Sequence, residues 1–237
     1  WAWQAIARDG KFQVALSGGT TPREMYRVLA TQEFRTQIDW PRVHVFWSDE
    51  RTVPPEDARS YYGMTRRELL LRVPLPGENI HRMEAEITPI GRAAHSYETV
   101  LRQWLPLDDR GFPVFHLVVL GMGVDGETAA LFPGAKLLRE TTRWVSTPET
   151  DTVGTRRMTL TLPVIEAAER ILFLVTGVKK ANMLRLVLCG SAGREIPAQM
   201  VQPRHGERIF IVDEAAARLL PVRNDVAGPV SDPKTRP

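Results

Sequence analysis

Short apolar runs alternate with amphipathic stretches along most of this 237-residue chain. Runs rich in β-branched and aromatic residues predict strands, and stretches with apolar residues at helical spacing predict helices between them. Strands that alternate with helices are typical of an α/β fold with a mostly parallel sheet flanked by helices. About seven strands are predicted, over 13–17, 43–48, 114–120, 144–146, 158–162, 170–176 and 208–212.

Residues that favour helix ends mark the starts of several predicted helices. Pro22 suits the first turn of a helix. Ser60 is placed to cap a helix through Leu71. Asp213 is placed to cap a closing helix to Leu220. Further helices are predicted over 91–105, 163–168 and 180–188.

Length and composition are those of one domain. With 43% hydrophobic residues, the chain can bury a substantial core. We predict a single domain over 1–227 and a flexible tail over 228–237, which holds three prolines and almost nothing apolar. The chain does not begin with Met, and we expect that residues ahead of Trp1 are missing.

Charge and cysteine usage exclude several classes of function. Lys and Arg exceed Asp and Glu by 31 to 28 without a run of five like charges, which favours a small anionic ligand over nucleic acid. Cys189 is the only cysteine, so neither a disulfide framework nor a thiolate metal cluster is predicted. The longest apolar run, 171–175, is too short to span a bilayer. We expect a cytoplasmic protein with no membrane or nucleic-acid partner and no metal.

The stretch 114–134 carries the strongest functional signal. Its predicted strand runs into Gly121, Gly123 and Gly126, which bracket Asp125 and Glu127. Glycines there allow tight turns and a close approach of backbone N–H groups to a ligand. The spacing of the three glycines also matches a dinucleotide fingerprint, but that reading needs a full crossover helix, for which Pro133 leaves no room. We therefore predict an active-site loop.

Two other strands are followed by candidate ligand-binding segments. A glycine-rich turn, Gly18, Gly19, Thr20 and Thr21, joins a strand to a helix N-terminus, an arrangement that binds phosphate; an ordinary Thr-capped turn is the alternative. Asp49, Glu50 and Arg51 follow the next strand, where a solvated loop is the alternative. Carboxyl ends of parallel strands share one edge of a sheet, so the three segments can converge. Their side chains fit a phosphorylated substrate that undergoes proton-transfer or hydrolytic chemistry.

Three motifs in this order resemble the 6-phosphogluconolactonases of the glucosamine-6-phosphate isomerase/6-phosphogluconolactonase family. They read L-S-G-G-T-T-P at 16–22, S-D-E-R-T-V-P at 48–54 and L-G-M-G-V-D-G-E-T-A-A-L-F-P-G at 120–134. Weaker similarity continues in R-M-T-L-T at 157–161 and G-V-K-K-A at 177–181. The resemblance implies a NagB/RpiA/CoA-transferase-like fold.

The resemblance also implies an activity, the hydrolysis of 6-phospho-D-glucono-1,5-lactone to 6-phosphogluconate in the oxidative pentose phosphate pathway. No cofactor is implied, and the expected partner is this small phosphorylated sugar lactone, bound by a monomer or weak homodimer. The alternatives are a glucosamine-6-phosphate deaminase or isomerase-like enzyme and a non-catalytic sugar-phosphate binder. A deaminase is the lesser candidate, because the residues after the shared D-G differ.

Roles for individual residues follow from the same resemblance. The substrate-binding set comprises Gly18, Gly19, Thr20, Thr21, Asp49, Arg51 and Gly123, with the glycine-rich turn and Arg51 on the phosphate. Asp125 and Glu127 would face the lactone as catalytic residues. Glu127 stands where the family has a His general base, and a carboxylate is a weaker base unless burial or Asp125 raises its pKa.

Two further departures concern the substrate-binding set. The family's S-N-Y segment appears here as Ser60, Tyr61 and Tyr62. A phosphate-side Lys of the family is absent near 152–155, and Arg156 or Arg157 can replace it, since guanidinium binds phosphate in a bidentate fashion. We place Arg157 in the substrate-binding set. The resulting hypothesis is that Glu127 deprotonates a water that attacks the lactone carbonyl.

Overall fold

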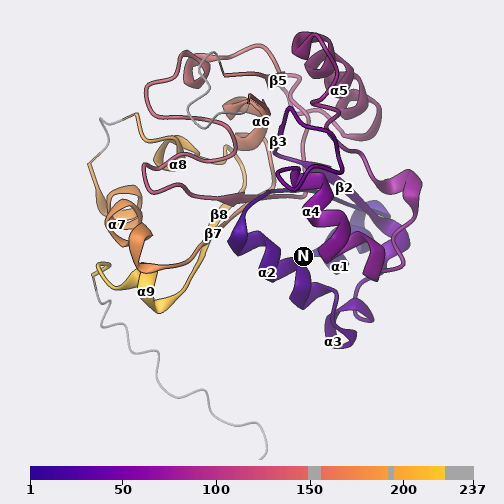
Figure 1. The fold of residues 1–237 in the computed structure, drawn as a ribbon, viewed down its shortest axis with the longest axis horizontal. Coiled ribbons are helices and arrows are strands. Elements are labelled where there is room, and N and C mark those ends of the chain that lie inside the picture. The colour runs from indigo at the N-terminus through magenta and orange to yellow at the C-terminus, as the bar shows by residue number, and fades with distance from the viewer. Residues whose placement is uncertain (149–155, 192–194, 222–237) are drawn as a thin grey trace, which may run out of the picture.

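The centre of the computed structural model is a five-stranded parallel sheet in the order β2-β1-β4-β7-β8 (Figure 1). The structure describes residues 1–148, 156–191 and 195–221. Every residue of β1, β2 and nearly all of β4 and β7 is buried, as expected for parallel strands covered on both faces. The strands are β1 (Phe12–Leu16), β2 (Val43–Trp47), β4 (Leu117–Gly121), β7 (Arg170–Val175) and β8 (Glu207–Val212). The predicted α/β class is confirmed.

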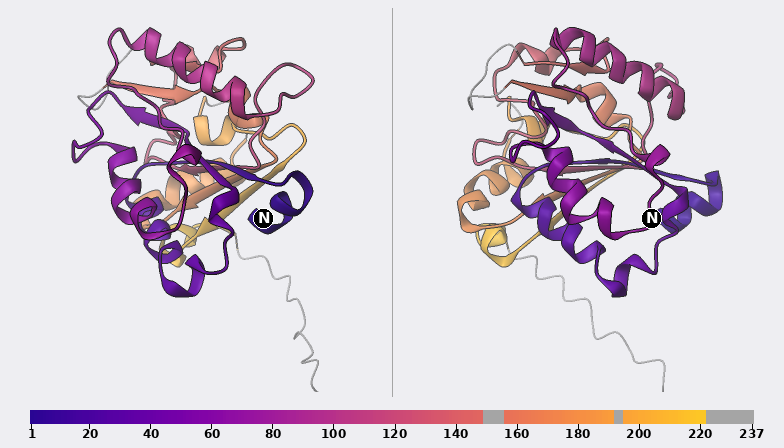
Figure 2. Two further views of the ribbon diagram at one scale, coloured as in Figure 1. Left: turned by 90° about the vertical axis from the view of Figure 1, so that its right-hand side faces the viewer. Right: turned by 45° about the vertical axis from the view of Figure 1, so that its right-hand side comes forward.

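Helices cover both faces of this sheet. The helices α2 (Thr20–Leu29) and α4 (Tyr61–Glu68) pack together on one side, while α5 (Ile90–Trp104) lies on the other (Figure 2). The remaining α-helices are α1 (Ala2–Asp9), α3 (Gln32–Arg35), α6 (Leu162–Glu166), α7 (Ala181–Cys189), α8 (Pro197–Met200) and α9 (Glu214–Ala217). In the described part of the chain, none of these helices has the length and apolar character needed to cross a membrane.

Segment 49–51, expected as a ligand-binding segment after the strand 43–48 or as a solvated loop, is itself a strand. This strand, β3 (Asp49–Arg51), pairs antiparallel with β6 (Arg157–Leu160), which also pairs with β5 (Val145–Ser146) to form a second, three-stranded sheet. Charged residues have low strand propensity, and pairing with a distant segment overrides it here. Because Asp49 lies opposite Thr159, it is a diagonal neighbour of Arg157 on the same face.

The predicted caps are present, although the helices that they begin are shorter than expected. The Ser60 side chain accepts a hydrogen bond from the Gly63 N–H at the start of α4. The Asp213 carboxylate accepts one from the Ala216 N–H at the start of α9. The helix α4 ends at Glu68, because Leu69 leaves helical geometry. The predicted tail, 228–237, lies outside the described residues.

Candidate active site

A cavity of about 180 Å³ lies at the carboxyl edge of the parallel sheet. Segments that follow β1, β2, β4 and β7 all contribute to its wall, so the predicted convergence of segments is present, with strand β3 supplying Asp49. Eight of the ten predicted site residues line the cavity, namely Gly18, Gly19, Thr20, Thr21, Asp49, Gly123, Glu127 and Arg157.

The glycine-rich turn presents a helix N-terminus to this cavity. Gly19 is the N-cap of α2 with a φ of 105°, which favours glycine, and no side chain caps the helix. A Cβ on Gly18 would lie 2.0 Å from the Tyr61 ring, so the turn can pack here only without a side chain. Thr21 Oγ1 is instead 2.7 Å from Thr176 Oγ1 in the loop after β7. The alternative of a Thr-capped turn therefore fails, and the uncapped N–H groups suit an anion.

A charged cluster forms another part of the cavity wall. The Asp49 carboxylate is 1% exposed and lies 2.9 Å from Arg157 Nη2. The Arg157 guanidinium is also 3.9 Å from Glu127 Oε2, and it donates a hydrogen bond of 2.7 Å to the Tyr61 hydroxyl. Burial raises the pKa of Asp49, and the Arg157 charge offsets part of that rise. The ladder between β3 and β6 thus holds an acidic and a basic side chain together inside the protein.

Glu127 has the properties that a carboxylate base requires. Burial raises the pKa of its carboxyl, the charges of Asp125 and Asp49 raise the pKa further, and Arg157 and Lys180 oppose them. Its side chain remains 28% exposed, so a water can reach it. This is the direction of shift expected from the sequence for a Glu that acts near neutral pH.

Comparison with known proteins gives these features a family. The sequence pattern described as glucosamine-6-phosphate isomerases/6-phosphogluconolactonase matches residues 1–210. The chain belongs to this family. The 6-phosphogluconolactonase of Synechocystis sp. is 36% identical over 218 residues, which cover 92% of this chain and 88% of the relative.

Solved structures of the family share the fold. The 6-phosphogluconolactonase from Trypanosoma brucei has a TM-score of 0.79 at 29% identity, over 91% of this chain and 88% of that chain. A monomeric glucosamine-6-phosphate deaminase of the NagB superfamily has a TM-score of 0.75 at 19% identity, over 91% of both chains. The second likeness shows the fold alone, and it confirms the predicted NagB/RpiA-like α/β architecture.

Two predicted residues of the family motifs lie outside the cavity wall. Asp125 is exposed, and its Oδ1 accepts a hydrogen bond of 3.1 Å from the Glu127 N–H within the same turn. Arg51 donates to the Arg59 carbonyl at 3.1 Å, and its guanidinium packs 4.7 Å from the centroid of the Tyr61 ring. Asp125 therefore shapes the turn that carries Glu127, and Arg51 lies behind Tyr61.

Lys180 and Tyr61 are among the cavity residues that were missed from the sequence. Lys180, the last residue of the one-turn 3₁₀ helix Val178–Lys180, lines the cavity, and its burial lowers its pKa. The family-like G-V-K-K-A segment at 177–181 was the available signal for it. Tyr61 lies in the altered S-N-Y segment, and nothing in the sequence showed that it reaches Arg157.

The dinucleotide reading can also be tested against the backbone. After Gly126, the described chain forms turns, and the next helix is the one-turn 3₁₀ helix Lys136–Arg139. No crossover helix follows the third glycine in this described stretch. The dinucleotide-binding interpretation is therefore rejected, as expected from Pro133, which leaves no room for a full helix.

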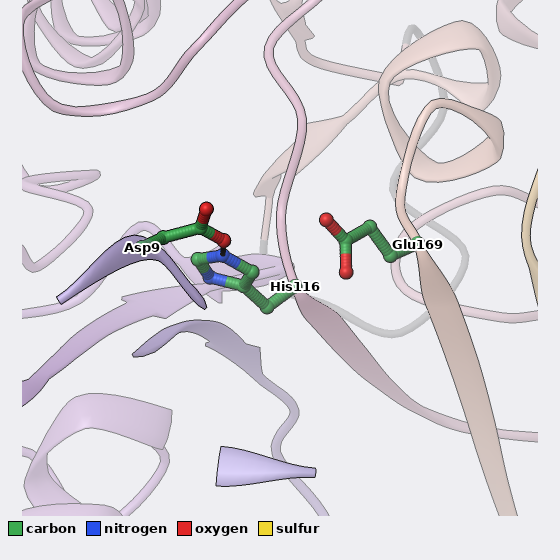
Figure 3. Close-up of side chains that lie close together, drawn as sticks. All are labelled: Asp9, His116 and Glu169. Atoms are coloured by element: carbon green, nitrogen blue, oxygen red, sulfur yellow. Dashed lines mark hydrogen bonds and ion pairs between the residues drawn. The ribbon is translucent and has the colours of Figure 1, made fainter. Parts of the chain in front are cut away.

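A second polar cluster, formed by Asp9, His116 and Glu169, lies at the amino edge of the sheet (Figure 3). Their oxygen and nitrogen atoms approach closely enough to suggest metal ligands. However, His116 Nδ1 accepts a hydrogen bond of 2.9 Å from the Gln13 N–H, so the ring proton is on Nε2 and points to Asp9 Oδ2 at 2.9 Å. Arg8 also binds both carboxylates. With no lone pair of His116 available, this cluster is a structural network.

Proposed function

We propose that this protein hydrolyses 6-phospho-D-glucono-1,5-lactone to 6-phosphogluconate in the oxidative pentose phosphate pathway. The observation that carries the proposal is one cavity that combines an uncapped helix N-terminus with a carboxylate of raised pKa. The first feature suits the phosphate and the second suits an attacking water. The name of the Synechocystis relative, 6-phosphogluconolactonase, supports the same activity.

The phosphate binds at the glycine-rich turn in this proposal. Gly18, Gly19, Thr20 and Thr21 supply N–H and hydroxyl donors, and the α2 dipole favours the negative charge. Arg157 and Lys180 supply cationic side chains in the cavity wall, in the place of the family Lys expected near 152–155, a segment outside the described residues. Arg51, whose guanidinium packs against the Tyr61 ring, adds positive charge near the phosphate. Asp49 orients Arg157 through their ion pair.

Glu127 acts as the general base. Its carboxylate takes a proton from a water, and the hydroxide formed adds to the lactone carbonyl carbon to give a tetrahedral oxyanion. Loop N–H groups at the cavity stabilise that oxyanion in this proposal. When the intermediate collapses, the bond from carbon to ring oxygen breaks, and protonated Glu127 returns its proton to the departing oxygen. No cofactor takes part in these steps.

Asp125 supports this base as a positioning residue. Its carboxylate accepts a hydrogen bond of 3.1 Å from the Glu127 backbone N–H, and its charge helps to raise the pKa of Glu127.

We further infer a cytoplasmic monomer or weak homodimer. The single cysteine, Cys189, is exposed as a free thiol, which agrees with a reducing compartment. Size-exclusion chromatography with light scattering tests the oligomeric state.

The deciding experiment measures lactone hydrolysis above the spontaneous rate, coupled to 6-phosphogluconate dehydrogenase, from about pH 5 to 8. We expect Glu127→Gln to lose about 10²- to 10⁴-fold in kcat. In the matched control Asp125→Asn, we expect a loss below about ten-fold and an acidic limb at lower pH, because one charge that raises the pKa of Glu127 is gone.

The alternatives give other results in the same assays. Ammonia released from glucosamine-6-phosphate, without lactone hydrolysis, would indicate a deaminase. Binding of 6-phosphogluconate by a protein that hydrolyses no lactone would indicate a non-catalytic sugar-phosphate binder. Full activity in Glu127→Gln would remove Glu127 from the mechanism while leaving the activity itself intact.

A further inference from the structure

Tyr61 lies between the two arginines of the candidate site. Its ring centroid is 4.7 Å from the Arg51 guanidinium carbon and 5.6 Å from that of Arg157. Its hydroxyl accepts a hydrogen bond of 2.7 Å from Arg157 Nη2. The mechanism proposed above assigns no role to this side chain, although it lines the cavity.

The Arg157 guanidinium is held in an incomplete contact with Asp49. Nη2 lies 2.9 Å from Asp49 Oδ2, yet Oδ2 receives no well-aligned hydrogen bond from it, and one of the two N–H groups of Nη2 donates to Tyr61. Arg157 Nε is also buried without a hydrogen-bond partner. Arginine and carboxylate commonly form a two-bond fork, which would satisfy both atoms. By accepting one N–H of Nη2, the Tyr61 hydroxyl holds the guanidinium in the orientation that leaves the fork open.

We propose that Tyr61 is a positioning residue, which holds the Arg157 guanidinium away from a closed fork with Asp49 and so keeps it available to the substrate phosphate. This inference rests on the proposed function, because it takes Arg157 as a phosphate ligand. Buried polar atoms left without partners are costly in a folded protein, and a ligand that satisfies them recovers that cost.

Tyr61 is itself fixed firmly enough for this role. Its ring packs directly against Gly18, where a Cβ would overlap it, and its backbone N–H donates a hydrogen bond of 2.9 Å to Glu50 Oε1. Burial raises the pKa of Tyr61 to about 12, so the hydroxyl stays protonated at neutral pH. The neutral hydroxyl therefore remains an acceptor for the Arg157 N–H.

The same contact links the phosphate site to the base. Arg157 is 3.9 Å from Glu127, and its charge lowers the pKa of that carboxyl against the effect of burial. Without the Tyr61 hydroxyl, Nη2 turns to Asp49 Oδ2 and moves away from Glu127. The pKa of Glu127 then rises, because the Arg157 charge that lowers it is farther away.

The test compares Tyr61→Phe with Tyr62→Phe, a matched control from the same helix whose ring packs on Trp47 outside the cavity. For Tyr61→Phe, we expect KM and the Kd of 6-phosphogluconate, measured by calorimetry, to rise about three- to ten-fold. We expect kcat within about two-fold at pH 8 and an acidic limb of kcat/KM at higher pH. Tyr62→Phe is expected to change none of these quantities.

A second background separates positioning from direct contact. If Tyr61 acts through Arg157, Tyr61→Phe adds little to the Kd of 6-phosphogluconate in an Arg157→Lys protein. A full Tyr61→Phe effect in that background would overturn the proposal in favour of direct substrate contact. An unchanged Kd and pH profile in the single variant would also overturn it. The Kd comparison remains decisive even if the wild-type protein hydrolyses no lactone, an outcome that removes only the proposed activity.

Discussion

The two edges of the parallel sheet carry clusters of similar side chains, but the two clusters have different roles. At the amino edge, the cluster is Arg8, Asp9, His116 and Glu169; at the carboxyl edge, it is Asp49, Tyr61, Glu127 and Arg157. Residue type alone does not distinguish a structural network from a reactive site. Burial and hydrogen bonding do distinguish them.

The sign of the pKa shift differs between the two edges. At the amino edge, the hydrogen bond from Arg8 and then that from His116 lower the pKa of Asp9 to about 2. At the carboxyl edge, burial raises the pKa values of Asp49 and Glu127. A carboxylate whose pKa is lowered by hydrogen bonds at the surface is typical of a structural network. A carboxylate whose pKa is raised because burial outweighs its partners is typical of a functional site.

The largest expected effect breaks the buried pair at the carboxyl edge. Replacing Arg157 with Met leaves the Asp49 charge buried and unpaired, so we expect the free energy of unfolding to fall by about 3–5 kcal/mol. We also expect lactone hydrolysis to be lost. Urea unfolding measures this loss. The control Arg156→Met changes an exposed neighbour and is expected to stay within about 0.5 kcal/mol.

The double variant Arg157→Met/Asp49→Asn sharpens that result, because it removes the unpaired charge. We expect it to recover part of the lost stability without recovering activity. If Arg157→Met proved no more costly than Arg8→Met at the amino edge, the contrast between the two edges would be wrong.

The next largest effect concerns the close packing of Gly18 against Tyr61. An alanine Cβ there would lie 2.0 Å from a ring carbon, so Gly18→Ala is expected to cost about 1–3 kcal/mol and to displace the hydroxyl from Arg157. Gly121→Ala is the control, since a Cβ there meets nothing within 4 Å. Thermal unfolding and the KM for the lactone report the two consequences. Equal behaviour of the two variants would contradict the packing argument.

The sequence predicted the backbone segments of the site better than it predicted the positions of their side chains. Apolar strands followed by glycines or charges predicted the three converging segments, because the carboxyl edge of a parallel sheet is fixed by topology. The β3 strand was missed, since D-E-R has low strand propensity and pairs with β6, more than a hundred positions later. That long-range pairing is also what brings Asp49 to Arg157.

Side-chain direction was the part that spacing could not supply. Asp125 and Glu127 are two residues apart, yet one accepts a hydrogen bond from its own turn and the other lines the cavity. Arg51, expected on the phosphate, packs its guanidinium 4.7 Å from the centroid of the Tyr61 ring, and Tyr61 rather than Arg51 lines the cavity. In both cases the outcome depends on loop geometry and on a neighbour from another element, which a linear motif does not encode.

A smaller effect tests the cost of keeping Glu127 at the carboxyl edge. Its pKa is raised on folding, so the folded state disfavours its charged form at pH values above the ordinary pKa of about 4.3. Glu127→Gln is therefore expected to raise the midpoint of thermal unfolding by about 2–4 °C at pH 8. The gain should shrink as pH falls toward 5. A destabilised variant at pH 8 would mean that Arg157 outweighs burial.

The smallest expected effect lies at the amino edge and completes the contrast. Asp9→Asn removes a carboxylate that is 36% exposed, so its ion pair with Arg8 is screened by solvent. We expect a loss of about 0.2–1 kcal/mol, confined to pH values above the lowered pKa of about 2, and no change in kcat or KM. Zn²⁺ should not alter thermal unfolding of the wild type or of Asp9→Asn. The Nδ1 lone pair of His116 already accepts the Gln13 N–H, so it is not available to a metal. Stabilisation of the wild type by Zn²⁺, lost in Asp9→Asn, would make the amino edge a second ligand site and remove the distinction between the edges.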